Sequence, residues 1–176
     1  MESPSRGGSP APPLSPPHRA MPTCGDGTED PTMHTLEQVM RSRRLLTARP
    51  SDRVFDVVSR MTAVNVGAVT VLEGEKLMGV FSERDLMTRV VVAGRDPHTT
   101  RLDEVMTTEV VTADLCESRD ACLEKMQRAG CRHLPVLANG HVIAMISMRD
   151  LLWDEIEEQV EEIRQLRAYV WQTPPA

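Results

Sequence analysis

Residues 79–86 of the sequence read GVFSERDL, and residues 144–151 read AMISMRDL. In both stretches a hydrophobic run leads into Ser-x-x-Asp, and the two copies lie 65 positions apart. A repeat at a fixed offset is typical of a duplicated structural unit. Upstream residues keep the same offset, since Leu46, Thr47 and Met61 match Val111, Thr112 and Met126. The sequence therefore predicts two copies of one unit in tandem.

Each copy has the pattern of a short helix, a strand, a helix, two strands and a final helix. The second copy also contains Asn139-Gly140, a strong signal for a two-residue hairpin turn. This alternation indicates an α/β fold. The expected segments of the first copy are a strand at 45–47, a helix over 54–61 and strands at 68–72 and 77–81; those of the second are a helix over 119–129 and a strand at 133–137.

The overall composition excludes some classes of partner. The chain has 176 residues, 40% of them hydrophobic, which is enough to bury one sizeable core. Its formal net charge is −6, and no Lys/Arg stripe is visible, so nucleic acid is not an expected partner. The longest apolar runs fall far short of the roughly 20 residues that a membrane helix needs. No membrane partner is expected either.

The sequence lacks the motifs of catalysis and of metal binding. It contains no Gly-x-Ser-x-Gly elbow, no phosphate loop ending in Gly-Lys-Ser/Thr and no Gly-x-Gly-x-x-Gly. The four cysteines form no Cys-x-x-Cys pair, and the five histidines show no zinc-ligand spacing. We therefore expect a protein that is not an enzyme and that holds no metal or covalent cofactor.

The first 32 residues differ in character from the rest. They contain eight of the thirteen prolines, with Ser and Gly between them and few apolar side chains. Such a segment cannot bury enough surface to offset its ordering entropy, so it is predicted to be disordered. It lacks the apolar core of a secretory signal, and its prolines oppose the helix of a mitochondrial presequence. A cytoplasmic protein is expected, with organellar targeting left open.

The repeated Ser-x-x-Asp has two interpretations. It is an ordinary helix start, in which the hydroxyl of Ser82 or Ser147 accepts from the amide of Asp85 or Asp150. The Asp carboxylate in turn accepts from the amide of the serine. Alternatively, a strand that ends at a helix N-terminus offers free amides to an anion, and a carboxylate beside it accepts two vicinal hydroxyls of a nucleotide. The recurrence of the motif after matched hairpins favours the second interpretation.

The two repeats resemble a tandem pair of cystathionine-β-synthase (CBS) domains, also called a Bateman module. The resemblance covers about residues 35–157. It implies two β-α-β-β-α repeats packed about a pseudo-twofold, a long C-terminal helix and flat homodimers. It also implies an adenosyl ligand in the cleft between the repeats: AMP, ADP, ATP with magnesium, or S-adenosylmethionine. The corresponding boundaries are a tail at 1–32, repeats at 33–97 and 98–157, and a helix extension with tail at 158–176.

The resemblance also implies site residues. In the family the motif Asp holds ribose hydroxyls, the motif Ser lies near the ribose or phosphate, and the segment around the early Thr offers backbone contacts to adenine. One site would therefore contain Ser82 and Asp85 with Leu46 and Thr47, and the other Ser147 and Asp150 with Val111 and Thr112. The strand with Arg132, His133 and Pro135 would bring basic side chains near the phosphates.

The two copies are not equivalent, so one good site and one weak or empty site are expected. Residues 132–136 read RHLPV where the first copy has GAVTV, and Ala144 replaces the motif glycine. Arg84 and Arg149, one residue before each Asp, either reach phosphate or lie on a solvated helix face. His133 either contacts phosphate or is a satisfied core residue.

The last helix is a second feature that calls for an explanation. From Ser147 it can run without Gly or Pro to about Gln172, with an apolar stripe along one face. Either the whole stripe packs on the domain, or it is a surface for self-association or for an unidentified protein partner. The stripe consists of Leu152, Ile156, Val160, Ile163, Leu166 and Val170.

We therefore expect a non-catalytic regulatory module that binds an adenosyl ligand between its repeats and signals to a partner protein by a conformational shift. Two other classes stay open. One is a structural or interaction protein with degenerate nucleotide sites that acts through dimerisation and its C-terminal helix. The other is a small enzyme such as a nucleotide hydrolase.

Overall fold

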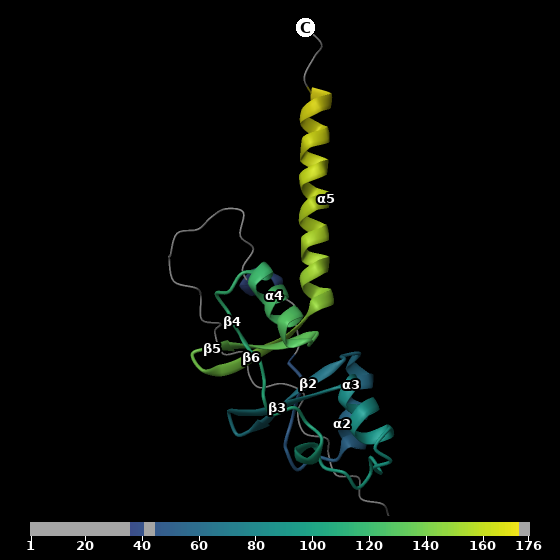
Figure 1. The fold of residues 1–176 in the computed structure, drawn as a ribbon. Helices are drawn as coiled ribbons and strands as arrows, with labels where there is room; N and C mark the ends of the chain where they lie inside the picture. Colours follow the sequence, from purple (N-terminus) through teal and green to yellow (C-terminus); the bar gives the residue numbers. More distant parts are fainter. Residues whose placement is uncertain (1–35, 41–44, 173–176) are drawn as a thin grey trace, which may run out of the picture.

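The structure is a computed structural model that describes residues 36–40 and 45–172, so the predicted disorder of residues 1–32 lies outside its described part. Figure 1 shows two lobes, one above the other, and a long helix that leaves the upper lobe. Each lobe holds one three-stranded sheet, and the strand order is the same in both. The predicted α/β fold of two similar repeats is confirmed.

The first repeat is built on the sheet β1-β2-β3, in which β1 is parallel to β2 and β2 is antiparallel to β3. Its central helix packs on the sheet through Val54, Val57 and Met61, three of the predicted apolar positions. The elements of this repeat are β1 (Thr47–Ala48), α2 (Val54–Val64), β2 (Ala68–Glu73), β3 (Lys76–Ser82), α3 (Glu83–Asp85) and the π-helix η1 (Leu86–Val91).

The second repeat has the same connectivity, with β4 parallel to β5 and β5 antiparallel to β6. Asn139 and Gly140 join β5 to β6 with φ angles of 52° and 78°, which are the left-handed values that a two-residue hairpin turn needs. The predicted hairpin is thus confirmed. The elements of this repeat are β4 (Ala113–Asp114), α4 (Arg119–Ala129), β5 (His133–Ala138), β6 (His141–Ser147) and α5 (Met148–Gln172).

The two short helices that lead into the repeats are exchanged between them. Helix α1 (Leu36–Val39) precedes the first repeat in the chain, yet Leu36 packs in the core of the second. The 3₁₀-helix η2 (Leu102–Glu104) precedes the second repeat, and Leu102 packs in the core of the first. The Leu102 amide also donates to the Asp52 carbonyl at 3.0 Å. Each repeat therefore completes its core with a segment that leads into the other.

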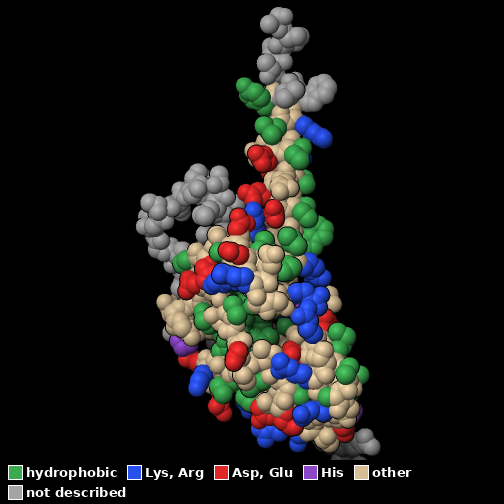
Figure 2. Space-filling model, in the orientation of Figure 1, with side chains coloured by type: hydrophobic (Ala, Val, Ile, Leu, Met, Phe, Trp, Pro, Cys, Tyr) green, Lys and Arg blue, Asp and Glu red, His purple; other side chains and the backbone are tan. Residues whose placement is uncertain are grey.

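Helix α5 leaves the domain after its first turns. Leu151 is fully buried, and Arg119 of α4 forms ion pairs with Asp154 and Glu158 at 3.4 and 2.9 Å. Beyond these contacts the helix projects from the molecule, with hydrophobic side chains along it in Figure 2. The stripe residues are between 43% and 59% exposed from Leu152 to Leu166, so the alternative in which the whole stripe packs on the domain is wrong.

Candidate functional site

The first copy of the motif forms a closed hydrogen-bond box at the end of β3. Asp85 Oδ2 accepts from the Ser82 amide at 2.9 Å and from Ser82 Oγ at 2.6 Å. The Asp85 amide donates to Ser82 Oγ at 3.4 Å. This is the predicted capping box, and it fixes the Asp85 carboxylate at the N-terminus of α3. The helix-start interpretation of the motif is therefore correct, and it leaves the second carboxylate oxygen for other partners.

That second oxygen, Asp85 Oδ1, has two long contacts. It accepts from Thr107 Oγ1 at 3.3 Å and lies 3.4 Å from Arg89 Nε. Both distances are beyond the most common range for hydrogen bonds, so these contacts are weak. The residue is only 8% exposed. Neither Thr107 nor Arg89 was predicted from the sequence. Thr107 directly follows Val105-Met106, a pair that repeats Val39-Met40, and Arg89 lies one helical turn after Asp85.

Thr107 reaches this place because its segment pairs with the edge of β3. The Val80 amide donates to the Thr107 carbonyl at 2.9 Å, and the Thr107 amide donates to the Val80 carbonyl at 2.8 Å. A Cβ atom at Gly79 would lie 2.7 Å from that Thr107 carbonyl oxygen. The motif glycine is thus needed here for close backbone approach. Ala144 takes its place in the second repeat.

Asp85 lies in a cleft of about 330 Å³ between the two repeats, here called the Asp85 cleft. Three arginines and one histidine contribute to its walls, against the carboxylates of Glu83, Asp85 and Glu109. Arg84 spans the repeats, because its Nη1 donates to the Gly130 carbonyl at the end of α4 at 2.8 Å. The cleft residues predicted from the sequence are Ser82, Arg84, Asp85, Val111, Arg132 and His133.

His133 is half-buried at the start of β5 and lies against Gly67, whose Cβ position would be 3.3 Å from the imidazole. Burial lowers the pKa of His133, and the nearby Arg132 lowers it further, whereas Glu83 and Asp150 oppose that shift. The imidazole therefore stays neutral down to a lower pH than an ordinary histidine does. A phosphate beside it would favour the protonated form.

The Asp85 cleft combines residues that the sequence assigned to two different sites. Val111 joins Ser82 and Asp85 of the first repeat, whereas Leu46 and Thr47 do not line this cleft. The physical reason is the exchange of lead-in segments, which carries residues 102–111 onto the first repeat. Leu46 instead packs on the core of the first repeat.

Thr47 and Thr112 have matched structural roles. The carbonyl of Thr47 accepts from Arg60 at 3.3 Å, and that of Thr112 accepts from Lys125 at 3.2 Å. Thr112 and Pro135 are likewise not among the residues that line the Asp85 cleft. These contacts connect the start of β1 to α2 and the start of β4 to α4.

Pro135 affects the cleft indirectly. It occupies the position of Thr70, whose amide and hydroxyl both donate to the Leu46 carbonyl, at 3.3 and 3.1 Å. Proline has no amide hydrogen, and Pro135 has no hydroxyl. The carbonyl of Val111, the counterpart of Leu46, therefore receives neither of these donors from residue 135.

The second copy of the motif forms the same box. Asp150 Oδ2 accepts from the Ser147 amide at 3.1 Å and from Ser147 Oγ at 2.7 Å, and Asp150 is 8% exposed. Arg149 is exposed at the start of α5. The counterpart of the Thr107 segment is residues 41–44, which lie outside the described residues. The structure therefore describes only one wall of the second expected site, at Asp150.

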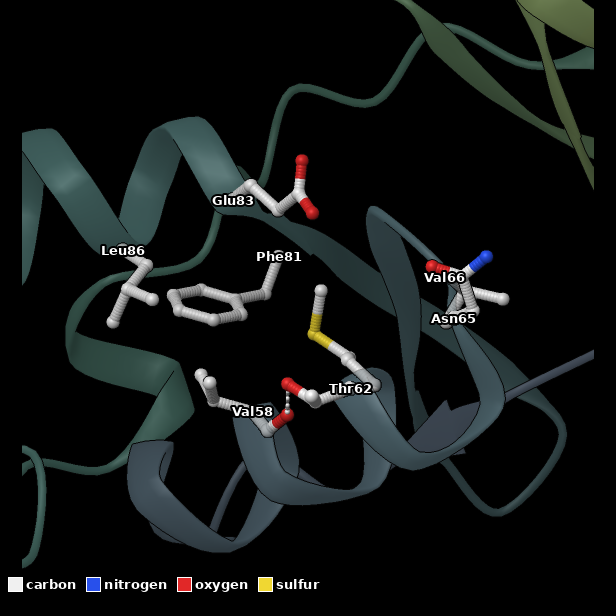
Figure 3. Close-up of a pocket in the computed structure, with 8 residues that line it drawn as sticks. Val58, Thr62, Asn65, Val66, Phe81, Glu83 and Leu86 are labelled. Atoms are coloured by element: carbon white, nitrogen blue, oxygen red, sulfur yellow. Dashed lines mark hydrogen bonds between the residues drawn. The ribbon is translucent and has the colours of Figure 1, made fainter.

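A smaller hollow lies between α2 and the end of β3, with a volume of about 140 Å³ (Figure 3). Val58, Phe81 and Leu86 give it apolar walls, and Glu83 lies at its edge. Ligand pockets usually measure about 300–1,000 Å³, a range that includes the Asp85 cleft and excludes this hollow. The Asp85 cleft is therefore the better candidate site.

The described residues contain no group of three or more His, Cys, Asp or Glu side chains placed to hold a metal ion. None of the helices in the described part combines the length and the apolar character needed to cross a membrane.

A model of the CBS domain family matches the chain twice, over residues 36–92 and 102–154. The mitochondrial CBS domain-containing protein CBSX3 of Arabidopsis thaliana is 32% identical over 149 residues, which cover 77% of this chain and 71% of that protein. CBSCBSPB2 of Arabidopsis thaliana is also 32% identical over 127 residues, but the chain spans only 24% of its length.

Solved structures share the fold. A CBS-domain protein from Burkholderia ambifaria MC40-6 is 33% identical with a TM-score of 0.69, covering 72% of this chain and 96% of that one. The CBS domain pair of protein MJ0100, solved in complex with 5′-methylthioadenosine and S-adenosyl-L-methionine, is 17% identical with a TM-score of 0.64. The matched part covers 72% of this chain and 98% of that pair, and at this identity the likeness shows the fold alone.

Proposed function

Because the chain belongs to the CBS domain family, we propose that it is a non-catalytic regulatory protein that binds an adenosyl ligand in the Asp85 cleft. One observation carries this proposal. The cleft brings a fixed carboxylate together with Arg84, Arg89 and Arg132 in a volume of about 330 Å³. A carboxylate for hydroxyls and cations for phosphates are what a nucleotide requires.

The ribose would lie at Asp85 Oδ1. Its two hydroxyls would replace the long contacts from Thr107 and Arg89, which at 3.3 and 3.4 Å are weak. Oδ2 would stay in the capping box, so binding would not disturb the helix start. Arg89 would stay held by its Nη1, which donates to the carbonyls of Val105 and Met106 at 3.1 and 2.6 Å. Arg132 and His133 would therefore be the first groups to meet a phosphate.

Adenine would lie against Val111. The Val111 carbonyl, without a donor from Pro135, would accept a hydrogen bond from the exocyclic amine of the base. This contact would distinguish adenine from a base with a keto group at the same position. MJ0100, which shares the fold, binds two adenosyl ligands. Any magnesium would enter with the phosphates of ATP.

Regulation would follow from the position of the cleft. Its walls come from both repeats, so a bound ligand would favour one relative orientation of the repeats over others. We propose that this shift is read by a partner protein and that the chain acts as a homodimer. The cytoplasmic location stays a prediction, and one curated relative is mitochondrial.

The test is isothermal titration of the full chain with AMP, ADP, ATP and S-adenosylmethionine, beside Asp85→Asn and Asp150→Asn. The two substitutions disturb the same capping box, so Asp150→Asn is a matched control for stability. We expect Asp85→Asn to weaken binding at least about tenfold, since one charge-assisted hydrogen bond contributes roughly 1.5–3 kcal/mol. If only Asp150→Asn weakens binding, the ligand occupies the other cleft.

If no ligand binds at about 1 mM and the melting temperature does not shift, the nucleotide proposal is wrong. The exposed stripe of α5 would then favour the alternative of an interaction protein with degenerate nucleotide sites.

A further inference from the structure

We propose that α5 pairs with α5 of a second copy of this chain, in parallel and in register, as a two-stranded coiled coil. This inference extends the proposed homodimer by naming its contact and orientation, and it does not depend on a ligand. The apolar stripe of α5 is open to solvent: Leu152, Ile156, Val160, Ile163 and Leu166 are 43%, 47%, 59%, 50% and 59% exposed. Soluble monomers rarely leave a continuous apolar surface of this kind uncovered.

The chain's own domain cannot cover the stripe, because it holds the opposite side of the helix. Leu151 is buried against the domain, and Asp154 and Glu158 form ion pairs with Arg119. At 100° per residue, these three positions lie about half a turn away from Ile156 and Ile163. Arg119 is only 13% exposed in its side chain, so this anchor fixes both the direction and the rotation of α5.

Five of the six stripe residues follow a heptad pattern, and Val160 falls at the neighbouring e position. The a positions are Ile156, Ile163 and Val170, and the d positions are Leu152, Gln159 and Leu166. Among parallel coiled coils, β-branched residues at a with leucine at d favour two strands. The residue types therefore select the number of helices.

Two polar contacts select the parallel orientation. In a parallel pair, Glu162 at g faces Arg167 at e of the second copy, and the contact occurs twice by symmetry. Gln159 meets Gln159 of the second copy, so the two amides can hydrogen-bond. In the antiparallel register that keeps all apolar layers, Glu162 faces Glu162 and Gln159 faces Ile163. Both contacts are then unfavourable.

The stripe covers fewer than three heptads, and an isolated coiled coil of this length is marginal. The helices do not have to associate alone, however. Each is rigidly attached to a CBS pair, and contacts between the two modules would raise the effective concentration of one helix near the other. We therefore infer that α5 pairing adds to a module dimer and selects the arrangement in which both helices leave the same end.

The first test is a charge exchange, measured by sedimentation equilibrium of the full chain at low salt. Glu162→Arg and Arg167→Glu should each raise the dimer dissociation constant about 2- to 30-fold, because two exposed ion pairs are lost. The double variant should restore the value of the unchanged chain. Single variants with an unchanged dissociation constant, or a double variant that stays weak, would overturn the pairing.

The second test concerns orientation. Ile163→Cys should form a disulfide between the two copies under mild oxidation, identified by mass spectrometry as 163 linked to 163. Glu161→Cys, on the outer side of the proposed pair, is the matched control and should not cross-link. A third variant carries both Ile156→Cys and Leu166→Cys. If it links residue 156 to residue 166 of the second copy, and Ile163→Cys forms no link, the helices are antiparallel and the proposal is overturned.

The ligand proposal can fail separately. Because α5 beyond its first turns does not line the Asp85 cleft, the α5 variants should titrate with nucleotide like the unchanged chain. If no nucleotide binds and the 163 link still forms, the ligand proposal is wrong and the helix pairing stands.

Discussion

Asp85 uses its two carboxylate oxygens for different purposes. Oδ2 closes the cap of α3 through contacts of 2.6 and 2.9 Å, whereas Oδ1 faces Thr107 and Arg89 at 3.3 and 3.4 Å. The short contacts hold the group in place, and the long ones can be exchanged for ligand hydroxyls with little loss. A motif that starts a helix can therefore also present a binding oxygen.

Pro135→Thr tests how the base is recognised. Threonine stands at the matched position of the first repeat, where Thr70 donates twice to the Leu46 carbonyl, so the sheet should accept the change. The new donors should occupy the Val111 carbonyl and weaken adenosine binding about 2- to 10-fold, the effect of one ordinary hydrogen bond. Titration with adenosine and inosine nucleotides checks this. The unchanged chain should prefer adenosine, and equal preference in both proteins would contradict the role of Val111.

His133 should make stability depend on pH. Burial and Arg132 lower the pKa of His133 in the folded chain, whereas in the unfolded chain it stays near 6.5. The unfolded chain therefore binds more protons as the pH falls, and the stability present above pH 6.5 is lost toward the folded pKa. Urea unfolding at pH 7, 6 and 5 should show a smaller loss for His133→Gln than for the unchanged chain. Equal losses would show that His133 is not the group responsible.

Among the elements, the lead-in segments decide the composition of the cleft. Local patterns predicted α4 over Arg119–Ala129, the Asn139-Gly140 hairpin and the helix that starts after Ser147, because each depends on neighbouring residues. The packing of η2 on the first repeat depends on tertiary contacts between segments far apart in sequence. Two copies with one pattern do not reveal which lead-in segment meets which core. For this reason Val111, and not the expected Thr47, lines the cleft with Asp85.

Gly79→Ala tests the contact between β3 and the Thr107 segment. Its Cβ would lie 2.7 Å from the Thr107 carbonyl oxygen and 2.8 Å from the Met106 sulfur, so the segment must move away. We expect a loss of about 1–3 kcal/mol in the free energy of unfolding, as for other overpacked sites, together with weaker ligand binding. Urea unfolding and titration measure the two effects.

The control for that change is Ala144→Gly at the matched position of the second repeat. It should lower stability by about 0.5–1 kcal/mol through backbone entropy and leave ligand affinity in the Asp85 cleft unchanged. If the two substitutions affect ligand affinity equally, close approach at Gly79 is not what forms the cleft.

At the scale of the whole molecule, the cleft and α5 are connected through the second repeat. Arg132 and His133 line the cleft at the start of β5, and Arg119 on the preceding helix holds α5. A ligand that turns the second repeat relative to the first would therefore also turn α5, which Figure 1 shows projecting from that repeat. The sequence predicted the stripe on α5, but only the structure showed that the domain leaves it uncovered.

The most direct measurement of the central claim is a crystal structure of the full chain with the adenosyl ligand that titrates most tightly. We predict density in the Asp85 cleft, with ribose hydroxyls within hydrogen-bond distance of Asp85 Oδ1 in place of its contact with Arg89 Nε, and with the base against Val111. An empty Asp85 cleft at saturating ligand, or a ligand bound at Asp150 alone, would contradict the proposed site.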